Sequence, residues 1–210
     1  MASLARKTKE AMSDPSVRKK VKAREAAFKA LREKGSDADW FSELCFCLMT
    51  ANSTARLGIE IQESLAEGCL TLPQKKVEGV LREHGHRFAR PRADYMCRAR
   101  SLPKLRAKIE SFGDDRLARE WLVENVLGLG YKEASHFLRN TGHFGVAILD
   151  RHIIRLMAEH SLIPEVPKTI TPKRYLEMEA TLDALSEQVK SPPGILDLYL
   201  WYMKTGEILK

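Results

Sequence analysis

The chain has 210 residues, and 44% of them are hydrophobic, which suffices for a core of its own in one large domain or two small ones. Its 35 Lys and Arg outnumber its 28 Asp and Glu, and the formal charge of +7 favours an anionic partner, most commonly nucleic acid, over a merely soluble basic protein. No segment approaches the roughly 18 uninterrupted apolar residues of a membrane span, and the N-terminus lacks an apolar signal core, so we expect a cytoplasmic protein without membrane contact.

Helical periodicity runs through almost the whole chain, and no alternating strand pattern interrupts it, so we predict an all-α fold. Asp14 and Pro15 have the cap and first-turn chemistry of a helix start. Short turns with Gly, Pro, Asp or Ser separate the expected helices. These helices span residues 15–33, 37–50, 56–67, 74–84, 91–112 with a break near Leu102, 114–127, 132–140, 151–160, 172–189 and 193–205.

The predicted helices divide into two lobes. Central helices would form one lobe over residues 35–134, and residues 1–34 together with 135–210 would form the second. The four cysteines lie scattered in apolar or helical patterns, and no second ligand pair accompanies the two that are closest in sequence, so we expect reduced core thiols and no metal site. They are Cys45, Cys47, Cys69 and Cys97.

A two-glycine turn joins two of the central helices. Glycine can take positive φ angles and lets a ligand approach the main chain, so Gly128 and Gly130 predict a tight hairpin. Exposed amides at the start of the second helix can bind a phosphate of DNA without reading its sequence. An ordinary interhelical turn is the alternative interpretation.

Lys132 follows this turn and lies in the first turn of the next helix. The positive end of the helix dipole opposes an ammonium there, which favours the neutral amine that an imine-forming lysine needs. The alternative is a lysine that contacts phosphate or simply faces solvent.

Asp150 precedes the helix that begins at Arg151, and it is an N-cap candidate. Capping would hold the carboxylate ionised. If its second oxygen faces a substrate, a fixed carboxylate can stabilise an oxocarbenium-like sugar or activate the attacking group.

Two motifs carry a family resemblance: Leu127-Gly128-Leu129-Gly130-Tyr131-Lys132-x-Ala134 and Leu149-Asp150-x-His152-Ile153-x-Arg155. With their spacing they resemble the helix-hairpin-helix DNA glycosylase superfamily, to which endonuclease III belongs. The run from 130 to 142, Trp121 and the segment from Asp197 to Tyr202 are similar to the archaeal-type 8-oxoguanine DNA glycosylase/lyase family. This resemblance covers most of the chain from Phe41 to Lys210. The cluster-binding cysteines of endonuclease III are missing after the Asp150 helix.

The resemblance implies a two-lobed helical fold with a DNA-binding cleft between the lobes, and an enzyme of base-excision repair. Lys132 would attack C1′ of the sugar that carries the 8-oxoguanine base and form a Schiff base, and Asp150 would assist. β-Elimination would then cut the strand on the 3′ side. The target base must be flipped out of the duplex, which costs about a few kcal/mol. 

The resemblance also assigns binding roles. Asn52 would fill the vacated position in the duplex, and Arg151 and His152 are expected to contact DNA beside Asp150. The flipped base would be recognised by Phe88 and Trp201, which would stack on its two faces, by the terminal carboxylate of Lys210, and more weakly by Asp197. Without the resemblance, a turn residue, two core aromatic residues and a frayed tail are the simpler interpretations.

We expect double-stranded DNA containing 8-oxoguanine as the partner, a monomer at the nucleoid of a prokaryote, and no redox cofactor or catalytic metal. The hairpin carbonyls are a candidate site for a monovalent cation. A helix-hairpin-helix glycosylase for another oxidised base would keep Lys132 and Asp150 without needing the Lys210 carboxylate. A noncatalytic helix-hairpin-helix module would not need Lys132 paired with Asp150.

Overall fold

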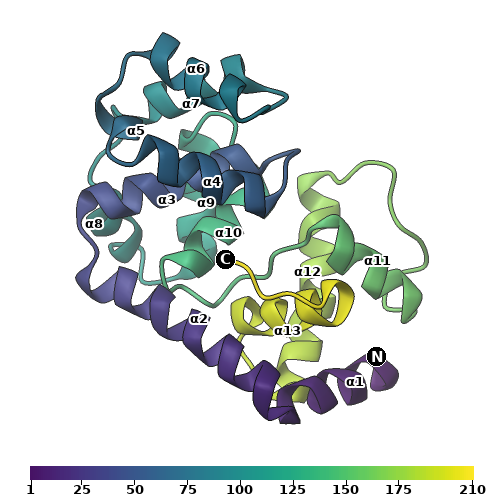
Figure 1. Ribbon diagram of the computed structural model, residues 1–210. Coiled ribbons are helices and arrows are strands. Elements are labelled where there is room, and N and C mark those ends of the chain that lie inside the picture. The colour runs from purple at the N-terminus through teal and green to yellow at the C-terminus, as the bar shows by residue number, and fades with distance from the viewer.

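In the computed structural model, which describes residues 1–210, the chain forms thirteen α-helices and no strand (Figure 1), so the predicted all-α fold is confirmed. None of the helices combines the length and the apolar composition that crossing a bilayer requires. In chain order the helices are α1 (Ala2–Ser13), α2 (Pro15–Lys34), α3 (Asp37–Thr50), α4 (Ala55–Leu65), α5 (Gly68–Thr71), α6 (Gln74–Glu83), α7 (Ala89–Ala99), α8 (Leu105–Glu110), α9 (Asp115–Asn125), α10 (Tyr131–Asn140), α11 (Arg151–Glu159), α12 (Pro172–Val189) and α13 (Pro193–Thr205).

Local caps explain why several helices begin where the sequence predicts. The Asp14 carboxylate accepts hydrogen bonds from the amides of Ser16 and Val17 at the start of α2. Ser36 and Asp39 form a reciprocal capping box at the start of α3. The expected helix 91–112 is interrupted as predicted, because α7 ends at Ala99 and α8 starts at Leu105. 

The helix α1 and the four-residue helix α5 were not predicted. Three residues of α1, Leu4, Ala5 and Thr8, are buried, and the helix packs on α12, α13 and α2. Its other positions are mostly basic or polar, so its apolar face is too narrow to predict a helix from this segment alone. 

Two large hydrophobic clusters and one small one hold the helices together. The first cluster contains buried residues from Trp40 to Val146, and the second joins Leu4 and Ala5 of α1 to buried residues from Ala147 to Leu200. The small cluster packs α2 against α13. Phe137 and Leu138 of α10 lie in the first cluster, and the division of the chain into lobes at residue 134 stays a prediction.

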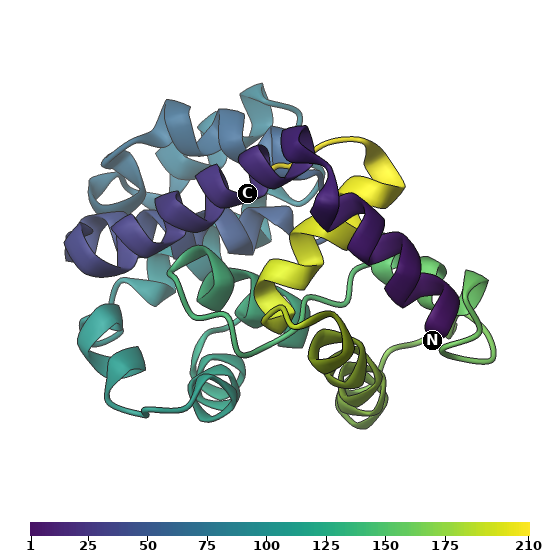
Figure 2. The same ribbon diagram turned by 90° about the horizontal axis from the view of Figure 1, so that it is seen from below.

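The two large clusters occupy opposite ends of the molecule. α5, α6 and α7 lie at the top of Figure 1, whereas α1, α12 and α13 lie toward the bottom, with α2 running along one side. Seen from below, α1 and α2 cross in front of the other helices (Figure 2). The C-terminal end of the chain lies in the middle, between the two groups of helices.

Candidate active site

The predicted hairpin is present between α9 and α10. The amide of Leu129 donates to the carbonyl of Val126 at 3.1 Å and closes the turn, and the Leu129 side chain is buried. Gly128 has a φ of +85°, and a Cβ added there would lie 2.2 Å from Cδ2 of Tyr95. Only glycine fits this position, because both the backbone conformation and the Tyr95 ring exclude a side chain.

Arg92 of α7 ties the hairpin to the turn after α3. This buried guanidinium donates to the Gly128 carbonyl at 3.3 Å and to the Ala51 carbonyl at 3.1 Å. Asn52, the next residue, is exposed and has a left-handed φ of +59°. Two turns far apart in sequence therefore lie side by side, and one of them presents Asn52 to solvent.

His86 fixes the segment that carries Phe88. Its Nδ1 accepts from the Phe88 amide at 3.1 Å, so Nε2 carries the proton and donates to the Met49 carbonyl at 2.9 Å. The half-buried Phe88 ring lies at the start of α7, with the Arg87 guanidinium 4.7 Å from its centroid. The start of α7 is thereby joined to the end of α3.

Lys132 occupies the second position of α10, directly after the hairpin. Its Nζ lies 3.2 Å from Oε1 of Glu133, and 29% of its side chain is exposed. An amine at this position is both tethered and accessible to a ligand. 

Asp150 is the N-cap of α11, as predicted. Its Oδ1 accepts hydrogen bonds from the amides of His152 and Ile153, both at 2.8 Å. Oδ2 has no hydrogen-bond partner within the protein, and the residue is half-buried. One oxygen therefore holds the helix while the other remains free for a ligand.

The charges of Lys132 and Asp150 both act on a third residue, Asp197. It is buried and forms an ion pair with Arg139. Burial raises the pKa of Asp197 to about 7; the Arg139 charge acts against this rise, the Asp150 carboxylate adds to it, and the Lys132 ammonium acts against it. Lys132, Asp150 and Arg139 therefore all lie close enough to Asp197 for their charges to act on its carboxyl group.

His136 lies one helical turn after Lys132 and is also buried. Its ring packs edge-on against Phe46 with centroids 5.4 Å apart, and neither ring nitrogen has a hydrogen-bond partner. Burial first, and then the charges of Arg139 and Lys132, hold the pKa of His136 well below its usual value. The imidazole is therefore neutral at pH 7.

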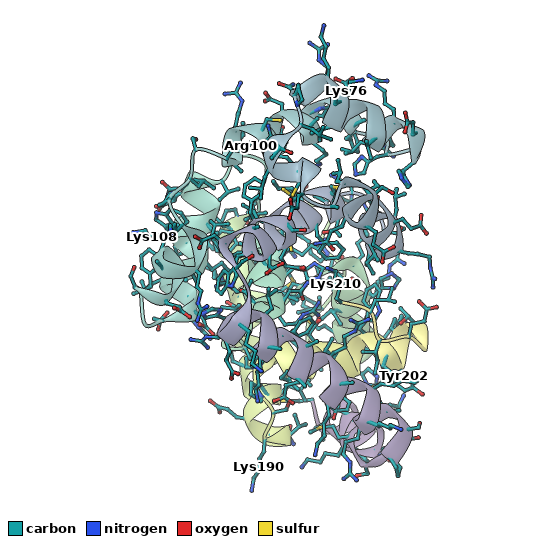
Figure 3. The ribbon with its side chains drawn as sticks, turned by 60° about the vertical axis from the view of Figure 1, so that its left-hand side comes forward. Lys76, Arg100, Lys108, Lys190, Tyr202 and Lys210 are labelled. Carbon is teal, nitrogen blue, oxygen red and sulfur yellow. The ribbon has the colours of Figure 1, made fainter.

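The last residue described, Lys210, reaches the centre of the molecule. Figure 3 shows it in the middle, whereas Lys76 and Lys190 lie at opposite ends. Its Nζ contacts the side chains of Glu43 at 2.8 Å and Gln62 at 2.5 Å. The tail is thus ordered by contacts rather than frayed.

Trp201, Arg151 and Phe88 are the remaining predicted site residues, and they do not all contact one another. The Trp201 ring packs edge-on against His152 with centroids 4.8 Å apart, and its buried Nε1 lacks a partner. Arg151 is exposed on the first turn of α11. Trp201 and Phe88 form no aromatic pair with each other, so a base held between them stays a prediction.

The sequence analysis missed the polar residues that support the site: the buried Glu43, Arg92, His136 and Arg139 and the half-buried Gln62. One of them had a detectable signal, because Glu43 is the only charged residue in the apolar run from Trp40 to Met49. A buried carboxylate in such a run needs a partner. No group of three or more His, Cys, Asp or Glu side chains is arranged to hold a metal ion, and all four cysteines are free thiols.

Comparison with known proteins identifies first the fold and then the family of this chain. A trapped covalent intermediate of endonuclease III with DNA matches at a TM-score of 0.56 and 17% identity, over 77% of this chain and 71% of that one, which shows a shared fold. The family model described as 8-oxoguanine DNA glycosylase matches residues 21–191. The chain therefore belongs to the 8-oxoguanine DNA glycosylase family.

Close relatives agree with this assignment. A protein of Methanocaldococcus jannaschii named 8-oxoguanine DNA glycosylase/AP lyase is 49% identical over 183 residues, which cover 87% of this chain and 88% of the relative. The crystal structure of the 8-oxoguanine glycosylase/lyase of that organism, in complex with a 15mer DNA containing 8-oxoguanine, matches with a TM-score of 0.94 and 45% identity over 99% of this chain and all of that one.

Proposed function

We propose that this protein is a bifunctional enzyme of base-excision repair, which removes 8-oxoguanine from double-stranded DNA and then cuts the strand. The observation that carries the proposal is an accessible amine, Lys132, directly after the glycine hairpin. The oxygen of Asp150 that the helix cap leaves free supports it. The names of the relatives and the DNA complex of the Methanocaldococcus protein support the same activity.

DNA binding uses the hairpin and the turn that Arg92 joins to it. Amides at the start of α10, with Gly128 and Gly130, hold a phosphate of the damaged strand. Asn52, exposed on its turn, enters the duplex position that the flipped base leaves. Arg151 and His152 hold the backbone beside Asp150.

The chemistry uses Lys132 as the nucleophile. The Lys132 ammonium first loses its proton to water. The neutral amine then forms a bond to C1′ while the glycosidic bond breaks, and the base leaves with the bonding electrons and takes up a proton. Asp150 stabilises the positive charge that develops on the sugar. Ring opening and loss of a proton from nitrogen give the Schiff base, and abstraction of a 2′ proton then expels the 3′ phosphate.

Base recognition uses the tail and the aromatic residues near it. The main-chain carboxylate of Lys210 accepts hydrogen bonds from guanine N1–H and the 2-amino group, a donor pair that adenine lacks. Trp201 and Phe88 stack on the flipped base. Asp197, paired with Arg139, holds the wall of the pocket.

The enzyme works as a monomer at the nucleoid in the cytoplasm. It uses no redox cofactor and no catalytic metal, since Lys132 and Asp150 supply the nucleophile and the carboxylate. A monovalent cation binds the hairpin carbonyls that Arg92 does not already occupy.

Borohydride trapping tests the proposal. The protein is incubated with duplexes that carry 8-oxoguanine, thymine glycol or no lesion, and Lys132→Gln serves as the matched control. We expect a covalent adduct with the 8-oxoguanine duplex for the natural chain and none for Lys132→Gln. Absence of any lesion-dependent adduct would support a noncatalytic DNA-binding module, and equal trapping on thymine glycol would support a glycosylase for another oxidised base.

A further inference from the structure

The Lys210 ammonium occupies a socket built from three side chains. Its Nζ lies 2.8 Å from Oε2 of Glu43, 2.5 Å from Oε1 of Gln62 and 4.4 Å from the centroid of the Phe46 ring. A carboxylate, an amide oxygen and an aromatic face are all attractive to a cation. The socket therefore suits the positive charge and the hydrogen-bond donors of an ammonium.

The two oxygen acceptors are held in place by further contacts. Glu43 has 6% of its side chain exposed, and its Oε1 accepts from Nδ2 of Asn140 at 2.6 Å. The Gln62 amide nitrogen donates to the carbonyl and hydroxyl oxygens of Ser42, which turns Oε1 toward Lys210. The socket is thus preorganised by residues of α3, α4 and α10.

Glu43 needs this cation. A buried carboxylate whose other partners are neutral amides is costly, and the Lys210 ammonium is the one cationic group that forms an ion pair with it. Docking of Lys210 therefore offsets the cost of burying the Glu43 carboxylate. 

The socket fixes the tail across the molecule. α13 ends at Thr205, and Gly206 turns the chain with a φ of +76°. Beyond it, the tail makes one other ion pair, between Glu207 and Arg56 of α4 at 3.0 Å. Both side chains are more than half exposed, so this pair holds the tail weakly. Lys210, with 19% of its side chain exposed, makes the better protected ion pair, and Ile208 adds a contact with the small hydrophobic cluster.

We propose that Glu43 is a positioning residue for base recognition: it binds the Lys210 side chain and so aims the main-chain carboxylate of Lys210 at the flipped base. This inference rests on the proposed function. Lys210 then has two roles: its ammonium binds Glu43, and its main-chain carboxylate recognises the flipped base. The His136 ring packs edge-on against Phe46, which forms one wall of the same socket.

The test compares Glu43→Gln and Lys210→Met with the control Glu207→Gln, which removes the exposed ion pair of the same tail. Two rates are measured under single-turnover conditions: excision of 8-oxoguanine, and cleavage of a duplex with a preformed abasic site, which needs no base recognition. We expect both anchor variants to slow excision by about 10- to 100-fold, the scale of a small misplacement at the reacting centre, with abasic-site cleavage nearly unchanged. The control should excise like the natural chain.

A double variant separates the anchor from a general structural effect. Glu43→Gln combined with Lys210→Met should be no slower than the slower single variant, because each change breaks the same contact. Normal excision by Lys210→Met would overturn the inference, and so would an equal fall of both rates in Lys210→Met. If the natural chain itself fails to excise 8-oxoguanine, the proposed function falls and this inference falls with it.

Discussion

Arg119 and Glu179 form a bidentate ion pair that is buried between the two large hydrophobic clusters. Nη1 and Nη2 of Arg119 lie 2.5 and 2.7 Å from the two carboxylate oxygens of Glu179, and each side chain is 1% exposed. Arg119 belongs to α9, which packs in the first cluster, and Glu179 belongs to α12, which packs in the second. Glu179 also accepts from the Ala147 amide at 3.0 Å, at the point where the chain passes from one cluster to the other. 

Removing one partner of this pair should destabilise the protein strongly. Glu179→Gln leaves the Arg119 charge buried without a counter-ion, and we expect the free energy of unfolding to fall by about 3–5 kcal/mol. The matched control is Asp183→Asn, because Asp183 pairs with Arg116 between the same two helices but at the surface, and this change should cost about 1 kcal/mol or less. Urea titration measures the free energy of unfolding of both variants. Equal losses would mean that the buried pair is no more important for stability than the surface pair.

Gly128 and Gly130 should respond differently to alanine. Gly128 has a φ of +85° and no room for a Cβ beside Tyr95, whereas Gly130 has a φ of −94° and its nearest neighbour is the end of the Glu133 side chain at 3.3 Å. We expect Gly128→Ala to lower the free energy of unfolding by about 1–3 kcal/mol and Gly130→Ala to change it little. Thermal and urea unfolding check this, and a tolerant Gly128→Ala would mean that the hairpin has another conformation.

Much of the fold was predictable because its signals are local. Asp14, Ser36 and Asp150 each cap a helix through amides two or three residues away, so a short stretch of sequence contains the whole interaction. The same holds for the hairpin, whose glycines and Lys132 lie within five residues of one another. These local features were enough to predict the helices, the turn and the candidate nucleophile.

The rest was hidden because it depends on partners far along the chain. Glu43 pairs with Lys210 and Arg139 pairs with Asp197, and nothing in either local segment indicates the other. A charge inside an apolar helix reveals that a partner must exist but not which one. α1 was missed for a similar reason, since two of the three helices that pack on it, α12 and α13, come at the other end of the sequence.

Asp197 should make the stability of the protein depend on pH. Burial raises its pKa from an ordinary value near 4 to about 7 in the folded state, so folding favours the protonated carboxyl. The stabilisation from this group is fully present below about pH 4 and is lost as the pH rises through about 7. We therefore expect the unfolding free energy of the natural chain to fall more steeply between pH 4 and 7 than that of Asp197→Asn. Urea titrations across this range measure the two slopes, and parallel slopes would mean that Asp197 stays ionised beside Arg139.

Substitutions of Asp150 can separate its role as the N-cap of α11 from its proposed role in excision. Serine at an N-cap also accepts from the following amides, so Asp150→Ser should keep α11 intact with little loss of stability, whereas Asp150→Ala should lose about 1 kcal/mol. Both variants remove the free oxygen, and we expect each to slow excision of 8-oxoguanine by about 100- to 1,000-fold, as the loss of one group that stabilises a transition state does. Single-turnover excision and urea unfolding, measured on the same preparations, give the two effects independently. If Asp150→Ser excises at the natural rate, the carboxylate is only a helix cap; if activity follows stability across the two variants, the loss is structural.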